Sequence, residues 1–317
     1  MIDQISIDVV VAALLPSIDS HQKKIERAFC LGLSGLQGSG KSTWAAALAH
    51  RLTDKHNLHT RTISLDDLYL DHDDLLSLKQ NNFGNKILQA RGQPGTHDEK
   101  LAQSFLTEVL APSLGSDRRA RIKWPAYDKS LNNGQGGRIP VSEWELVSLD
   151  ERLDVLIFEG WCLGFQPLPE DELREKRRMS ESSPPSQTQK VTERLTETLQ
   201  FHDLEHLLLI NASLKRYCET FMGPETFDSF VHLTTDDLSR VYCWREDQEE
   251  ALRRKGKPAM AKEDVIKFVQ GYMPAYELYL ERLNERSLFQ SSPLAVGKKH
   301  IRVVLDNNRN VVSTNVL

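Results

Sequence analysis

Short apolar runs alternate along this chain with longer stretches in which apolar residues recur at helical spacing. Residues 29–34 predict a buried strand, and residues 44–52 predict the helix that follows it. Residues 60–65 predict a second strand, and the apolar run 155–158, bounded by acidic residues, is typical of a parallel strand covered on both faces. Strands that alternate with helices predict an α/β fold with a mostly parallel, doubly wound sheet.

Further apolar runs follow in the second half of the chain. Residues 207–210 and 230–233 are both strand candidates, and 230–233 is the better one because Asp228 and a pair of threonines bound it. Residues 301–305, which precede a turn at 307–309, predict a final strand at the edge of the sheet.

We expect residues 1–317 to form one domain that begins with a helix within about residues 1–28. A segment within about residues 170–200 departs from the alternating pattern, because it is dense in charge, serine, glutamine and proline and offers little apolar surface to a core. That composition predicts a flexible insertion.

Composition and charge limit the classes of function. A chain with 40 basic and 45 acidic side chains has no long-range attraction to nucleic acid or to anionic lipid. No apolar stretch approaches the roughly 20 residues that span a bilayer, and the four cysteines lack metal or redox spacing. We therefore expect a cytosolic protein with a small-molecule substrate, and a nuclear pool is the alternative. The sequence gives no oligomeric state.

The strongest chemical signal is a phosphate-binding loop between the first predicted strand and its helix, where the chain fits the pattern GxxxxGK[ST]. Glycines let backbone amides turn toward phosphate oxygens, and the helix N-terminus adds positive charge. Lys41 is expected to reach the β and γ phosphates of ATP, and Ser42 to supply a hydroxyl to Mg²⁺. The predicted Mg-ATP site consists of Gly35, Leu36, Gln37, Gly38, Ser39, Gly40, Lys41, Ser42 and Thr43.

Two carboxylates directly follow predicted strands. Asp66 follows the second strand and is our candidate for the base that accepts a substrate hydroxyl proton. Its alternative role is a helix N-cap, which suits Asp67 or Asp71 better. Glu159 follows the apolar strand as a Walker B acid does and is predicted to hold a magnesium-bound water; its alternative is a buried carboxylate paired with a cation. A GTPase-type NKxD segment is missing from the sequence, which favours a kinase.

Six further segments carry a family resemblance: 64–69 (SLDDLY), 91–98 (RGQPGTHD), 124–130 (WPAYDKS), 158–165 (FEGWCLGF), 241–245 (VYCWR) and 268–276 (FVQGYMPAY). With the phosphate-binding loop, they resemble the plant-type D-glycerate 3-kinases and their fungal relatives, which are P-loop kinases. The resemblance implies a three-layer α/β P-loop fold with a helical lid, and transfer of the γ-phosphoryl group of Mg-ATP to a hydroxyl of D-glycerate. The alternatives are a kinase of another small hydroxylated metabolite (a sugar, a nucleoside or a pantothenate-like acid) and an ATP-binding regulatory protein without turnover.

The resemblance also implies roles for single residues. It agrees with Asp66 as the catalytic base and with Lys41 as a second catalytic residue. It also implies a lid over about residues 236–258, in which Arg245 covers the transferring phosphate. Pairing of Arg245 with Glu249, four residues along a helix, is the alternative. The implied acceptor-binding residues are Arg91, His97, Asp98, Tyr127, Lys129 and Arg138.

Overall fold

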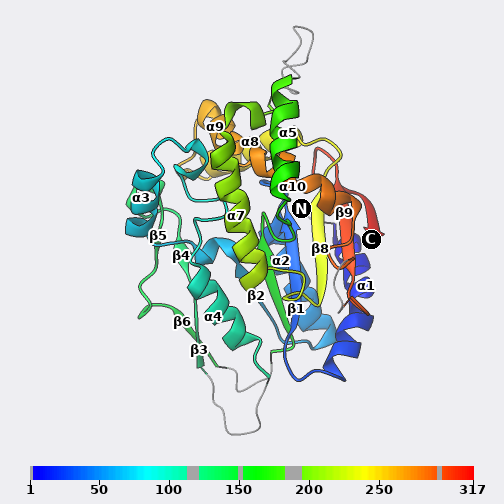
Figure 1. The fold of residues 1–317 in the computed structure, drawn as a ribbon. Helices are drawn as coiled ribbons and strands as arrows, with labels where there is room; N and C mark the ends of the chain where they lie inside the picture. The colour runs from blue at the N-terminus through cyan, green and yellow to red at the C-terminus, as the bar shows by residue number, and fades with distance from the viewer. Residues whose placement is uncertain (1–2, 113–120, 149–152, 183–194, 291–294) are drawn as a thin grey trace.

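The computed structural model describes residues 3–112, 121–148, 153–182, 195–290 and 295–317, and its centre is a six-stranded sheet (Figure 1). The strands lie in the order β10, β9, β8, β1, β7, β2. All neighbouring pairs are parallel except β9 and β10, which confirms the predicted α/β sheet. The bounds are Phe29–Gly35 (β1), Thr60–Ser64 (β2), Val155–Gly160 (β7), Ser229–Thr234 (β8), His300–Leu305 (β9) and Val311–Val316 (β10).

Strands β1 and β7 occupy the middle of the sheet. Every residue of both strands is buried, which explains why their sequences are nearly continuously apolar, with Ser34 and Glu159 near the carboxyl ends, and do not alternate. β2 pairs with the outer side of β7, and β8 pairs with the outer side of β1. The carboxyl end of β1 therefore lies where the chain divides between the two halves of the sheet, the usual ligand position in doubly wound folds.

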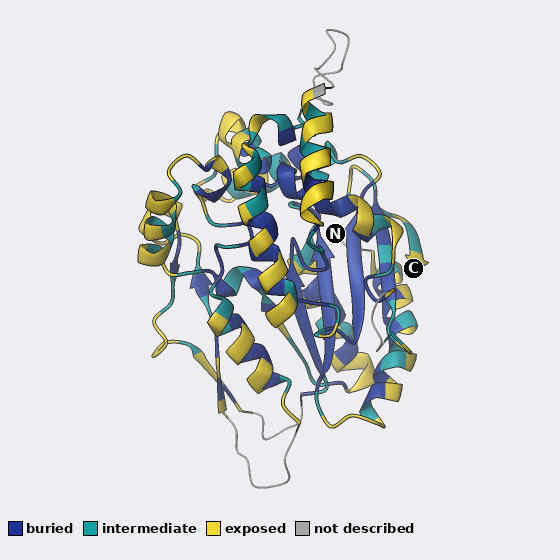
Figure 2. Cartoon of the chain, viewed as in Figure 1, coloured by how far each residue is buried: buried dark blue, intermediate teal, exposed yellow. Residues whose placement is uncertain are grey.

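Helices cover both faces of this sheet. α1 and α2 pack on each other and on β1, while α4 and α7 lie together on the opposite face (Figure 1). Figure 2 shows the strands buried and the outer helix faces exposed. Among the described residues, no helix has the length and apolarity needed to cross a membrane. The helices are Gln4–Gln22 (α1), Lys41–His56 (α2), His72–Asn81 (α3), Glu99–Val109 (α4), Glu170–Ser182 (α5), Leu204–Thr220 (α7), Arg240–Arg254 (α8), Lys262–Gln270 (α9) and Met273–Glu285 (α10).

Two small antiparallel pairs extend from the connection between α4 and β7. Arg121–Trp124 (β3) pairs with Glu145–Ser148 (β6), and Tyr127–Asp128 (β4) pairs with Gly137–Arg138 (β5). The second pair contains Tyr127 and Arg138, and Lys129 directly follows β4. The family resemblance implies acceptor binding for all three residues.

Three predictions differ from the structure. Residues 207–210 lie in α7, because Leu207 and Ile210 form part of one buried face of a longer helix. The strand predicted at 301–305 is β9, but it is not the edge, since β10 pairs along its outer side. The expected flexible insertion begins with helix α5, whose Leu173 is fully buried, and residues 183–194 lie outside the described residues.

Candidate active site

The phosphate-binding loop joins β1 to α2, as predicted. Gly38 and Gly40 have φ values of 80° and 90°, a left-handed conformation that favours glycine. A Cβ atom at Gly38 would lie 2.7 Å from the Cβ of Trp244 on α8. The loop therefore requires glycine at Gly38 for its backbone shape and for its close contact with α8.

Lys41, Ser42 and Glu159 meet at the start of α2. The hydroxyl of Ser42 donates to Oε1 of Glu159 at 2.8 Å, and Glu159 is buried at the end of β7. Nζ of Lys41 donates to the carbonyl of Leu36 at 3.4 Å. Burial lowers the pKa of Lys41, and the carboxylates of Glu159 and Asp66 oppose that shift. One ammonium thus lies in the field of two carboxylates.

The hydroxyl of Ser42 and the carboxylate of Glu159 are hard oxygen ligands of the kind that Mg²⁺ prefers. Mg²⁺ commonly takes only one or two protein ligands and completes its shell with water and phosphate oxygens. Across the described ranges, no group of three or more His, Cys, Asp or Glu side chains is placed to hold a metal. These two residues therefore fit a magnesium ion that arrives with a nucleotide better than a permanent protein cage.

The acidic pair after β2 divides its two roles between neighbouring residues. Asp67 Oδ2 accepts from the backbone N–H of Ser64 at 3.2 Å and so closes a cap on the 3₁₀ helix Leu65–Leu68. The carboxylate of Asp66 instead accepts from the Tyr69 hydroxyl at 2.9 Å and from Lys129 Nζ at 2.5 Å. Capping thus falls to Asp67, and Asp66 is directed toward cationic and hydroxyl partners.

The two carboxyls also differ in acidity. Burial favours the protonated form of Asp66, but the ammonium groups of Lys129 and Lys41 outweigh it and lower its pKa to about 2. Burial, reinforced by the charge of Asp66, raises the pKa of Asp67 to about 6. Asp66 is therefore fully ionised at neutral pH and Asp67 is not far from its titration range.

A cavity of about 180 Å³ brings these groups together at the carboxyl end of the sheet. Two further residues line it: Trp161 belongs to the segment 158–165 that resembles the family, and Gln248 lies three residues after the segment 241–245. The predicted residues in its wall are Gln37, Gly38, Gly40, Lys41, Ser42, Thr43, Asp66, Lys129, Glu159 and Arg245.

His97 does not line the cavity. Its ring is buried, stacks on Tyr69 with centroids 4.4 Å apart, and lies 3.1 Å from the Tyr217 hydroxyl through Nδ1. Burial lowers the pKa of His97 to about 3, so the ring is neutral at physiological pH. Tyr69 thus connects His97 to the carboxylate of Asp66.

The other residues of the two loops hold those loops together. Arg138 pairs with Asp98 at 2.8 Å, and Asp98 also caps α4 by accepting from Leu101. Arg91 donates to the carbonyls of Gly134 and Gln135 and lies over the Tyr127 ring, 5.8 Å from its centroid. Of the six acceptor residues implied by the resemblance, the structure brings only Lys129 into the cavity wall.

The predicted lid segment is α8, and Arg245 is its arginine in the cavity wall. Its guanidinium pairs with Glu249, donates to Gln248 at 2.8 Å and lies 4.7 Å from the Phe268 ring centroid. Glu249 is itself buried and accepts from the backbone of Met260. The alternative pairing of Arg245 with Glu249 is therefore present, and Arg245 also lines the same cavity as the phosphate loop.

Arg309, in the turn between β9 and β10, holds the phosphate loop against α8. It donates to the carbonyls of Gly38 and Trp244, each at 2.7 Å, and pairs with Asp247. The sequence predicts a turn at 307–309 but has no local signal for this role of Arg309. In the structure Arg309 has a φ of 65°, a conformation rare for residues other than glycine and asparagine.

No family model matches the chain, but individual proteins of known sequence and structure do. The uncharacterized kinase mug58 of Schizosaccharomyces pombe is 35% identical over 306 residues, which cover 96% of this chain and 97% of that protein. The chloroplastic D-glycerate 3-kinase of Arabidopsis thaliana is 33% identical over 285 residues, 90% of this chain but 54% of that longer protein.

A solved structure of D-glycerate 3-kinase from Cryptococcus neoformans is 29% identical and superposes with a TM-score of 0.82, covering 98% of this chain and 99% of that one. This likeness confirms the three-layer P-loop fold. The chain belongs to the plant-type and fungal D-glycerate 3-kinase family of P-loop kinases.

Proposed function

We propose that this kinase transfers the γ-phosphoryl group of Mg-ATP to a hydroxyl of a small molecule, with D-glycerate as the acceptor. One observation carries the proposal: an ionised carboxylate, Asp66, shares a single cavity with the phosphate-loop lysine and with a second ammonium, Lys129. A protein that only binds ATP needs no such base beside its phosphate loop. The chemical demand of phosphoryl transfer is mainly positioning and charge stabilisation, which these groups supply.

In the proposed reaction, the phosphate loop and Lys41 hold the β and γ phosphates. Asp66 accepts the proton of the acceptor hydroxyl. The oxygen of that hydroxyl forms a bond to the γ phosphorus, and the bond from the γ phosphorus to the β-phosphate oxygen breaks. Arg245 neutralises charge on the transferring group. Lys129 passes from Asp66 to the carboxylate of the acceptor, and the loops that carry Arg91, His97, Asp98, Tyr127 and Arg138 set the shape of the acceptor side.

Ser42 and Glu159 are the residues that would hold Mg²⁺ with the nucleotide. When bound, this ion neutralises the phosphate oxygens on which charge develops. Glu159→Gln keeps the size and the hydrogen bond with Ser42 but removes the charge. We expect the Mg²⁺ concentration for half-maximal activity to rise by about tenfold, the order lost when a carboxylate that supports a metal is replaced.

A magnesium titration at fixed ATP concentration measures this shift. Glu145→Gln is the matched control, because Glu145 is an exposed carboxylate that pairs with Arg61 away from the cavity. An unchanged magnesium requirement in Glu159→Gln would show that Glu159 only packs beneath the loop.

Arg309→Gln tests the contact that holds the phosphate loop on α8. The variant loses charged hydrogen bonds to two carbonyls. Because these bonds position the loop and do not contact the nucleotide, we expect the KM for ATP to rise by about tenfold with a smaller change in kcat. Arg254→Gln, which removes only an exposed pair with Glu250, should leave both constants unchanged. Equal KM values in the two variants would contradict a positioning role for Arg309.

The acceptor is tested by measuring ADP release with Mg-ATP and a panel of D-glycerate, pantothenate, uridine and fructose. Phosphorylated product is identified by mass spectrometry, and turnover by Lys41→Ala is subtracted as contamination. We expect D-glycerate to give the highest kcat/KM. A higher value for a sugar or a nucleoside would overturn the glycerate assignment, and ATP binding without turnover on any acceptor would favour a regulatory protein.

A further inference from the structure

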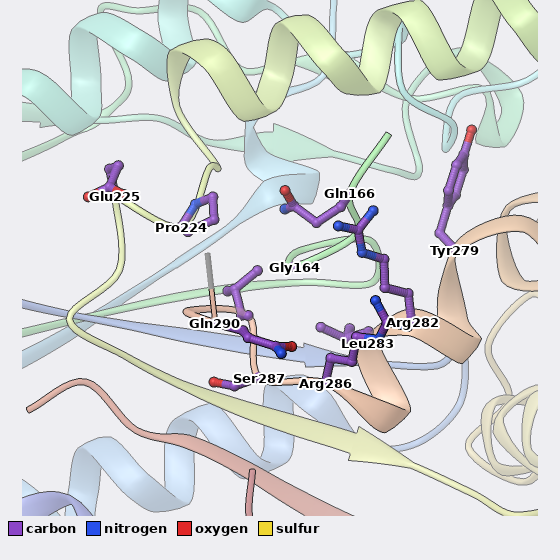
Figure 3. Close-up of a pocket in the computed structure, with 11 residues that line it drawn as sticks. Gly164, Gln166, Pro224, Glu225, Tyr279, Arg282, Leu283, Arg286, Ser287 and Gln290 are labelled. Atoms are coloured by element: carbon purple, nitrogen blue, oxygen red, sulfur yellow. The ribbon is translucent and has the colours of Figure 1, made fainter. Parts of the chain in front are cut away.

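A second cavity, of about 220 Å³, lies at the C-terminal end of α10, away from the phosphate loop (Figure 3). Its wall combines that helix end with the segment after β7 and the segment before β8. Figure 3 shows Arg282, Arg286 and Gln166 extending into the space, with Glu225 and Gln290 at its border. None of these residues lines the catalytic cavity.

The distinctive feature of this cavity is a pair of arginines without anionic partners. Arg282 lies in the last turn of α10, and Arg286 directly follows the helix in an extended conformation; both side chains are exposed and line the cavity. Within the described part of the chain, neither guanidinium forms a hydrogen bond or an ion pair. In contrast, Arg216 and Arg245, on neighbouring helices, each pair with a glutamate. Two like charges beside one cavity repel each other unless an anion lies between them.

We propose that this cavity is a second anion site, which binds a small molecule carrying one phosphate group. Guanidinium forks match the geometry of phosphate oxygens and bind them bidentately. Because a single water needs only about 10–15 Å³ of such space, the cavity of about 220 Å³ admits a phosphate with a few carbon atoms.

The same elements lead from this site to the phosphate loop. At the other end of α10, the Tyr276 hydroxyl accepts from the backbone N–H of Gln37 at 3.0 Å. The segment that carries Gly164 and Gln166 begins at Trp161, which lines the catalytic cavity. An anion bound at Arg282 and Arg286 therefore acts on two segments that shape the nucleotide site, and it changes nucleotide affinity. This coupling, unlike the binding itself, rests on the proposed function.

A simpler role for the two arginines is stabilisation of the negative end of the helix dipole. That role predicts that Arg282→Gln/Arg286→Gln loses thermal stability but keeps its affinity for phosphate. The binding proposal predicts instead that the double variant loses affinity for phosphate and keeps its thermal stability. Lys79→Gln is the matched control, because Lys79 is an exposed cation in the last turn of α3, which lies at the left edge of Figure 1, apart from α10.

The test is calorimetric titration with inorganic phosphate at constant ionic strength, with the phosphate loop saturated by a non-hydrolysable Mg-ATP analogue. We expect one phosphate per chain in the unmodified protein and in Lys79→Gln, and an affinity at least about tenfold weaker in the double variant, the order of one charged hydrogen bond. The melting temperature of each protein without phosphate verifies that it is folded.

Equal phosphate affinity in the double variant and the control overturns the site. Tighter binding of malonate than of phosphate overturns the assignment to a phosphate group. A third measurement, the Kd of the ATP analogue with and without phosphate, tests the coupling: an unchanged Kd refutes it. Failure of the analogue to bind at all contradicts the proposed kinase function, and phosphate binding to the free protein then tests the arginine site by the same comparison of variants.

Discussion

Lys41→Ala is expected to abolish ATP-dependent phosphorylation while the protein stays folded. Lys41 lies at the first position of α2 and makes one long hydrogen bond, to Leu36, so its ammonium contributes little to the packing of the core. Its charge instead lies in the wall of the cavity that Asp66 and Glu159 also line. Loss of a group that stabilises charge in the transition state costs at least about 10²–10³ in kcat.

A coupled assay of ADP formation measures this loss, and thermal unfolding measures the stability. Lys55→Ala is the control, since Lys55 is an exposed lysine in the last turn of the same helix. The control should retain normal kcat and KM, and both variants should melt close to the unmodified protein. Near-normal turnover by Lys41→Ala would overturn the assignment of residues 35–43 as the nucleotide-binding loop.

Sequence alone could predict the centre of the fold because its signals are local. The run 29–34 has Ser34 as its one polar residue and the run 155–158 has none, and such nearly continuous apolar runs are typical of strands buried on both faces. The helix at Lys41 follows from apolar spacing, and Gly40 precedes it in a left-handed conformation that only the structure reveals.

Sequence failed at the periphery, where several structures fit one pattern. Residues 207–210 are too few to separate a buried strand from one turn of a buried helix. Strand β10 was missed because its burial pattern shows no fully buried position, so it has no apolar run to mark it. In α5 a single apolar residue, Leu173, makes the buried contact, and no period can be read from one residue.

The residues of the site also differ in whether sequence alone could predict their contacts. The phosphate loop is contiguous and could be recognised, whereas the ion pair between Asp66 and Lys129 joins residues 63 positions apart. The contact of Arg309 with Gly38 joins residues 271 positions apart. Such contacts depend on the strand order, which brings the turn after β9 beside the end of β1, and no local pattern contains that information.

Asp66→Asn is the sharpest test, because it separates a catalytic base from a capping residue. Asparagine keeps the size of aspartate and can accept from Tyr69, but it cannot take the hydroxyl proton. We expect kcat to fall by about 10²–10⁴, the range attributed to general acid–base catalysis, with far less change in ATP affinity. Asp67→Asn, at the residue that caps Leu65–Leu68, should lose much less activity.

The pH dependence of kcat/KM gives a second, independent readout of the same assignment. A base must be ionised, so activity is lost as the pH falls through its pKa. With a pKa of about 2 at Asp66, the acidic limb of the profile should lie well below pH 4, whereas a base at Asp67, with a pKa of about 6, would place it near pH 6. A limb near pH 6 that persists in both variants belongs to the titration of the substrate. A limb near pH 6 that disappears only in Asp67→Asn, together with retained kcat in Asp66→Asn, would assign the base to Asp67.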